Sequence, residues 1–166
     1  MSHVVASIQA SSKPEFYAAF NRQLEAVLHG ERDWVCNLAQ MSALLMQTLP
    51  DLNWAGFYLL KTGELVLGPF QGKVACVRIA LGKGVCGTAA TRRESVVVPN
   101  VHEFPGHIAC DSASNSEVVV PLLHEGRLLG VLDLDSPQLN RFSDDDARGL
   151  ERAVAILLAS SDVPRI

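Results

Sequence analysis

The sequence contains no long hydrophobic run. None of its apolar stretches reaches the roughly 18 residues that a membrane-spanning helix requires, although hydrophobic residues make up 48% of the 166-residue chain. The N-terminal stretch MSHVVASIQASSKPEF also lacks a basic region followed by an apolar core, so we expect no signal peptide. The formal net charge of −4 gives no general attraction to nucleic acid or to an anionic membrane. These absences predict a globular protein that binds neither nucleic acid nor a membrane.

The usual motifs of metal and nucleotide sites are missing as well. No glycine-rich phosphate loop joins a strand to a helix, and no nucleophile-elbow motif occurs. The five histidines are scattered without zinc-like spacing, at His3, His29, His102, His107 and His124. We therefore predict no metal site and no bound cofactor. No repeat or linker divides the chain, so residues 1–166 are expected to form a single domain.

Hydrophobic periodicity predicts an α+β fold. A first helix is expected from the Ser12 cap to residue 28, and a second from the Asp33 cap to Pro50, with Cys36 on its apolar side. A final helix follows a cap at Ser143. Strand-like segments lie between the second and final helices, at 53–61, 63–70, 73–81, 95–100 and in a hairpin over 116–136, with a short helix within 82–94. This order is typical of an antiparallel sheet with helices segregated to one face.

Carboxylates interrupt a strand that otherwise appears buried. In LLGVLDLDS, strand alternation places Val131, Asp133 and Asp135 on one face. Glu117 begins the neighbouring strand of the hairpin and is expected nearby. Buried carboxylates are costly unless they are protonated or paired with a cation. The segment therefore indicates either a solvated sheet face or an acidic pocket that binds an amine or donates a proton to an oxygen.

Two aromatic residues on one strand allow two interpretations. Trp54 and Tyr58 are four residues apart and share a strand face. Such a pair can be ordinary core, or it can form one wall of the acidic pocket.

The four cysteines of the chain suit a reducing cytoplasm, where thiols serve packing, metal binding or redox chemistry. Cys76, Cys86 and Cys110 are too widely spaced for a zinc knuckle and too few for a disulfide scaffold. Each can be an inert buried residue. Alternatively the three form a redox set, in which one thiolate attacks and a second resolves the product as a disulfide. Cys110 lies in a long polar loop at 100–116, which favours function.

Three segments together resemble the free methionine-(R)-sulfoxide reductases, which are single-domain enzymes of the GAF fold. They are FQGKVACVRIALGKGVCGTAA, HIACDSASNSEVVVPL and GVLDLDSP followed by RFSDDD. The likeness covers about two-thirds of the chain, from Trp54 to the final helix. One departure is GKVAC, where the family pattern has a proline beside the alanine. The resemblance implies a central antiparallel sheet with the N- and C-terminal helices on one face and a loop-covered pocket on the other.

The resemblance also implies roles for the thiols. Cys110 matches the family's catalytic cysteine, Cys76 its principal resolving cysteine, and Cys86 a third thiol able to exchange. Thioredoxin would then be the external reductant, and a homodimer through the terminal helices is expected.

The substrate-binding positions are implied in the same way. The family's substrate-binding carboxylates match Glu117, Asp133 and Asp135, and Trp54 matches the aromatic residue that packs on the substrate methyl group. Tyr58 shares that strand face and would complete the wall. Two alternatives stay open: a GAF sensor that binds a small molecule with incidental cysteines, and a regulatory partner protein with redox-sensitive thiols.

Overall fold

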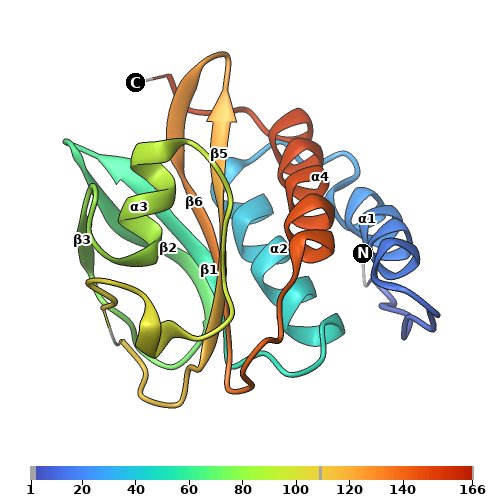
Figure 1. Ribbon diagram of the computed structural model, residues 1–166. Helices are drawn as coiled ribbons and strands as arrows, with labels where there is room; N and C mark the ends of the chain where they lie inside the picture. The colour runs from blue at the N-terminus through green and yellow to red at the C-terminus, as the bar shows by residue number, and fades with distance from the viewer. Residues whose placement is uncertain (1–2, 109, 166) are drawn as a thin grey trace.

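The structure is a computed structural model that describes residues 3–108 and 110–165 (Figure 1). One antiparallel sheet has the strand order β3-β2-β1-β6-β5-β4. Its strands are β1 (Trp54–Lys61), β2 (Glu64–Gly72), β3 (Arg78–Ala80), β4 (Val96–Val98), β5 (Ser116–His124) and β6 (Arg127–Ser136). The helices are α1 (Lys13–Leu28), α2 (Trp34–Thr48), α3 (Gly84–Arg92) and α4 (Asp144–Ser160), with a 3-10 turn, η1, at Val101–Glu103. The predicted α+β class is confirmed.

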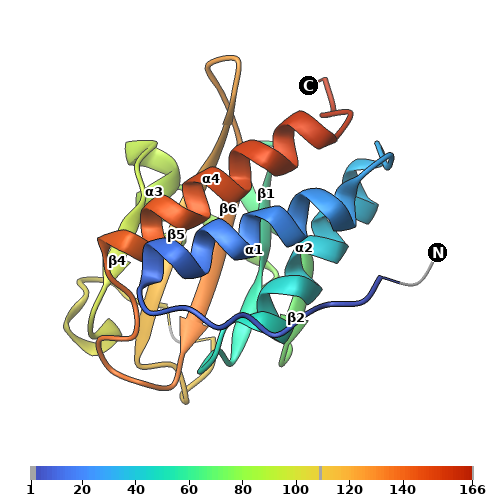
Figure 2. The same ribbon diagram turned by 90° about the vertical axis from the view of Figure 1, so that its right-hand side faces the viewer.

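The helices are distributed unequally over the two faces of the sheet. Helices α2 and α4 pack directly on one face, and α1 lies on them on the side away from the sheet (Figures 1 and 2). Leu132 and Leu134 of β6 point into this layer, where the larger apolar core forms. Helix α3 and the loops cover the opposite face. The alternation predicted for β6 is confirmed, because Val131 lies in the second, smaller core on that opposite face.

The predicted helix caps are confirmed. The Ser12 hydroxyl accepts a hydrogen bond from the Glu15 amide, and the Asp33 carboxylate accepts one from the Cys36 amide. At the start of α4, the Ser143 amide donates to the Asp146 carboxylate at 2.8 Å. Each cap satisfies backbone donors that the first turn of a helix leaves free.

Two local predictions are wrong. Only Arg78–Ala80 of the predicted strand 73–81 pairs with β2. The segment 73–77 forms no strand, and its Val74 and Val77 side chains are 88% and 65% exposed, so these two apolar residues cover no sheet face, whereas Ala75 and Cys76 are half-buried against the smaller core. Cys36 is exposed rather than packed. It lies two residues, or about 200° of helix rotation, from the buried Trp34 and Leu38 and therefore faces away from the core.

The register of the strands places residues of the candidate site next to one another. Trp54 on β1 is opposite Asp135 on β6, and Asp135 is opposite Glu117 on β5. One row across three adjacent strands therefore carries an aromatic ring and two carboxyl groups. Within the described residues, no helix is both long and apolar enough to cross a membrane.

Candidate active site

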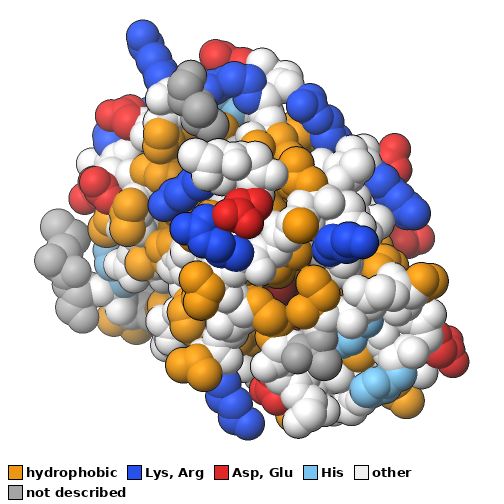
Figure 3. All heavy atoms as spheres, turned by 90° about the vertical axis from the view of Figure 1, so that its left-hand side faces the viewer, with side chains coloured by type: hydrophobic (Ala, Val, Ile, Leu, Met, Phe, Trp, Pro, Cys, Tyr) orange, Lys and Arg blue, Asp and Glu red, His pale blue; other side chains and the backbone are white. Residues whose placement is uncertain are grey.

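A pocket lies between the sheet and the α3 side of the molecule. Its floor comes from β1, β5 and β6, and its cover comes from α3 and from the loops that carry Cys76 and Cys110. Viewed from this side, hydrophobic side chains border a hollow with acidic atoms at its base (Figure 3). The cavity volume is about 40 Å³. The pocket is therefore small and deep, with room for a few water molecules or a compact polar group.

The base of the pocket is formed by buried acids. Glu117 and Asp133 are each 6% exposed, and Asp135 is half-buried beside them. The Cys86 thiol donates a long hydrogen bond of 3.9 Å to Glu117 Oε1. Asp133 Oδ1 is buried and finds no hydrogen-bond partner among the described residues. An unpaired buried acceptor is costly, so this oxygen is available to a ligand with hydrogen-bond donors.

Burial keeps protons on these acids. It raises the pKa of Glu117 well above its ordinary value, and the nearby charges of Asp133 and Asp135 raise it further. Burial likewise raises the pKa of Asp135, with Asp133 adding to the effect. Burial raises the pKa of Asp133 to about 6, although hydrogen bonds from Glu117 and Cys86 oppose the shift. Asp133 therefore ionises near pH 6, and the raised pKa of Glu117 favours its protonated form, which can donate a proton.

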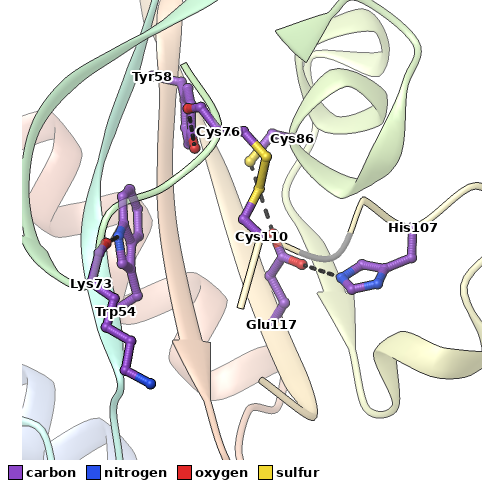
Figure 4. Close-up of a disulfide and its surroundings, with 8 residues drawn as sticks. All are labelled: Trp54, Tyr58, Lys73, Cys76, Cys86, His107, Cys110 and Glu117. Carbon is purple, nitrogen blue, oxygen red and sulfur yellow. Dashed lines mark hydrogen bonds and ion pairs between the residues drawn. A yellow bond between two sulfur atoms is a disulfide. The ribbon is translucent and has the colours of Figure 1, made fainter. Parts of the chain in front are cut away.

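Of the three predicted cysteines, Cys86 and Cys110 line this pocket, and Cys76 follows the lining residue Ala75 in the chain. Cys76 and Cys110 form a disulfide with their Cα atoms 5.7 Å apart, and Cys86 is a free, buried thiol beside it (Figure 4). Burial, followed by the charge of Asp133, raises the pKa of the Cys86 thiol well above its usual value. Cys86 therefore stays protonated and is a weak nucleophile. Cys110 is exposed, which leaves the disulfide open to an external thiol.

Both predicted aromatic residues form the pocket wall and also belong to the smaller core. The Trp54 ring stacks on the Tyr58 ring at a centroid distance of 5.9 Å and on the Phe70 ring at 5.2 Å. Trp54 Nε1 donates to the Lys73 carbonyl at 3.2 Å, and the Tyr58 hydroxyl donates to the Cys76 carbonyl at 3.0 Å. The two interpretations of this pair are thus compatible.

Sequence reasoning missed several polar residues at the pocket. His107 Nε2 lies 3.8 Å from Glu117 Oε2, and burial, followed by the charge of His102, lowers the pKa of His107. Asp111 accepts a hydrogen bond from the Asn53 side chain at 3.2 Å, and a bond from the Ala113 amide keeps the pKa of Asp111 low. These residues lie in or next to loops, where no periodicity marks them. Their only signal was proximity to Cys110 in the sequence.

One group at the base has the composition of a metal site. Cys86, Glu117 and Asp133 each bring a donor atom within 4.8 Å of the others. Burial raises the pKa of all three groups, so a bare metal ion would have to displace their protons to bind. The group contains no histidine, so the spacing of histidines in the sequence could not indicate it.

Fold and site together define a GAF domain, and the GAF domain family matches residues 37–157 of the chain. The chain is 54% identical to the free methionine-R-sulfoxide reductase of Escherichia coli, over 91% of this chain and 93% of that protein. It is 43% identical to the Saccharomyces cerevisiae protein of the same name, over 88% and 86% of the two chains. The solved free methionine-R-sulfoxide reductase of Neisseria meningitidis, in complex with its substrate, superposes with a TM-score of 0.91 at 45% identity, covering 96% of this chain and 95% of that chain. The chain therefore belongs to the free methionine-R-sulfoxide reductase family of GAF proteins.

Replacing Asp133 with Asn should make folding stability less dependent on pH. Well below pH 3.8, Asp133 is protonated in both the folded and the unfolded state, so its burial adds no titration penalty. At pH 4 the folded state still keeps this proton and roughly 60% of unfolded molecules have lost it, so the penalty remains small. As pH rises from 3.8 toward 6, the unfolded state releases this proton first and the wild-type free energy of unfolding falls. In urea titrations, Asp133→Asn should be more stable than wild type by about 1–3 kcal/mol at pH 7.5, with little difference at pH 4.

Glu94→Gln is the matched control, because Glu94 is exposed and lies outside the pocket. It should leave stability close to that of wild type at both pH values. A loss of stability in Asp133→Asn that is equal at pH 4 and pH 7.5 would contradict the assignment of a raised pKa.

Proposed function

We propose that this protein reduces free methionine-(R)-sulfoxide to methionine in the pocket described above. The observation that carries the proposal is the Cys76–Cys110 disulfide placed at a pocket whose base holds buried carboxyl groups. Thiols at such a site can supply two electrons, and the acids can supply a proton to an oxygen. The names of the relatives in E. coli and yeast support the same reaction.

Substrate recognition follows from the donors and acceptors of the pocket. The ammonium group of the free amino acid donates to Asp133, whose Oδ1 otherwise lacks a partner. The positive charge favours the ionised form of Asp133 and lowers its pKa from about 6. The substrate methyl group packs on Trp54, and the sulfoxide oxygen points toward Glu117. This arrangement distinguishes the two configurations at sulfur.

The reductive step uses Cys110 and a protonated carboxyl group. Glu117 hydrogen-bonds the sulfoxide oxygen and makes the sulfur electrophilic. As the Cys110 thiolate attacks, the S–O bond of the substrate breaks and the oxygen, with a proton from Glu117, ends on Cys110 as a sulfenic acid. Methionine leaves with its sulfur reduced by two electrons, and Cys110 is oxidised by two.

The sulfenic acid is then resolved by Cys76. The Cys76 thiol displaces the hydroxyl as water and forms the disulfide with Cys110. Cys86 is the less suitable resolving thiol, because burial raises its pKa and keeps it protonated. It remains available for later exchange.

Recycling requires an external dithiol, and we assign this role to thioredoxin. One of its thiols attacks the exposed side of the disulfide, and a second thiol completes the exchange. The reaction fits the cytoplasm, where such reductants keep thiols reduced. A homodimer through the terminal helices stays a prediction from the family resemblance.

The proposed reaction is tested with racemic free methionine sulfoxide and a dithiol, followed by chiral chromatography of the remaining substrate. Wild type should consume the R epimer alone, and Cys110→Ser should consume neither. Cys36→Ser is the control, because Cys36 is exposed and lies outside the pocket; it should match wild type. If reduced wild-type protein consumes neither epimer, the protein is a ligand-binding GAF module or a regulatory thiol protein instead.

Blocking the substrate amine should abolish recognition. N-acetylmethionine sulfoxide has no ammonium group and would leave the buried acids without their partner. We expect kcat/KM for this compound to be lower by at least about 10³-fold than for the free amino acid. Comparable turnover of both compounds, measured by methionine or N-acetylmethionine release, would show that the acids do not recognise the substrate amine.

A further inference from the structure

In the reduced protein, the segment that carries Cys76 has few backbone hydrogen bonds to the rest of the fold. Residues 73–77 lie between β2 and β3, outside the strand ladder, and Val74 and Val77 are largely exposed. The Val77 carbonyl accepts a backbone hydrogen bond from the Leu67 amide at 2.9 Å. Two further backbone anchors come from side chains of β1: Trp54 Nε1 bonds the Lys73 carbonyl, and the Tyr58 hydroxyl bonds the Cys76 carbonyl itself. Ala75 and Cys76 also pack against the smaller core, and the disulfide to Cys110 adds a covalent anchor in the oxidised protein. Exposed side chains and few backbone hydrogen bonds are features of a segment that opens more easily than the strands beside it.

Tyr58 is a rigid anchor for this segment. It lies in the middle of β1, is 2% exposed, and stacks on the Trp54 ring with an interplanar angle of 24°. Burial, followed by the charges of Asp133 and Cys86, raises the pKa of Tyr58, so its hydroxyl remains a donor throughout the neutral range. Figure 4 shows this hydroxyl directed at the Cys76 backbone, apart from the Glu117 carboxyl group. The ring lines the pocket, whereas the hydroxyl holds the backbone of a cysteine.

We propose that the Tyr58 hydroxyl is a positioning group that holds the Cys76 thiol within reach of the Cys110 sulfenic acid. This inference rests on the proposed function and deepens it, because it assigns the resolving step to a fixed part of the fold. Fixing the Cys76 backbone raises the effective concentration of its thiol at Cys110. Rapid closure in turn protects the sulfenic acid from further oxidation, which is irreversible for most proteins.

The role of the Tyr58 hydroxyl can be tested separately from that of the Tyr58 ring. Tyr58→Phe keeps the aromatic wall and removes only the bond to the Cys76 carbonyl. The chain has two tyrosines, and the other one provides the matched control. Tyr17 is also buried, and its hydroxyl bonds Asp146 Oδ1 at 2.7 Å between α1 and α4. Tyr17→Phe therefore removes a buried hydroxyl hydrogen bond far from the pocket.

The experiment follows disulfide closure after a single oxidation of reduced protein. In one arm methionine-(R)-sulfoxide is the oxidant. In the other, one equivalent of hydrogen peroxide oxidises the Cys110 thiolate to the sulfenic acid and releases hydroxide. Cys76 then condenses with the sulfenic acid and water leaves, as in the first arm. Quenched samples are trapped with dimedone, a sulfenic acid reagent, and mass spectrometry counts adduct and disulfide over time.

Tyr58→Phe should close the disulfide about 3- to 10-fold more slowly than wild type in both arms, the effect of one net hydrogen bond. The dimedone adduct on Cys110 should accumulate accordingly. First-turnover methionine release is measured in the same samples, so that a change in the substrate step is distinguished from a change in disulfide closure. Tyr17→Phe should close its disulfide at the wild-type rate.

Equal closure rates in wild type and Tyr58→Phe would overturn the inference, and so would equal slowing in both tyrosine variants. If wild type forms no methionine but Tyr58→Phe closes slowly after peroxide, the proposed function fails while the positioning role stands. Thermal unfolding of both variants, checked by circular dichroism, establishes that the comparison is made between folded proteins.

Discussion

Three carboxyl groups lie out of water on adjacent strands, and the cost of that burial determines the chemistry of the pocket. Low dielectric surroundings and mutual repulsion raise the pKa of Glu117 and Asp135, and burial raises that of Asp133 to about 6. The sheet cannot relieve this cost by turning the side chains outward, because strand register fixes Glu117 and Asp135 in a row with Trp54, and alternation along β6 places Asp133 on the same face. A cationic ligand with an oxygen to protonate relieves it, which is why a zwitterionic sulfoxide suits the site.

The rigid and the exchangeable parts of the site occupy different elements. The acids and aromatic rings are on β1, β5 and β6, whose opposite face is packed against α2 and α4. The two disulfide-bonded cysteines are on loop segments that meet over the pocket. In the proposed reaction, the acids and rings keep their geometry while the thiols change oxidation state and partner. The buried Cys86 beside them has a raised pKa, which favours its protonated form and makes it a weak nucleophile.

Features set by local periodicity could be predicted from the sequence. Alternation in LLGVLDLDS correctly placed Asp133 and Asp135 on the pocket face, since a buried strand must send its leucines to the core. Features set by tertiary contacts could not be predicted from the sequence. Val74 and Val77 suggested a strand but find no sheet face to cover, and the loop residue His107 lies near Glu117 only because the chain folds back. The family resemblance supplied the cysteine pairing that spacing left open.

Counting products of a single turnover tests the central claim most directly. Fully reduced protein would be mixed with excess methionine-(R)-sulfoxide without any added dithiol, and both methionine and remaining free thiols would be measured. The account predicts one methionine per chain and the loss of two of the four thiols, with peptide mapping placing the new disulfide between Cys76 and Cys110. Methionine formation without thiol loss, or thiol loss without methionine, would contradict it.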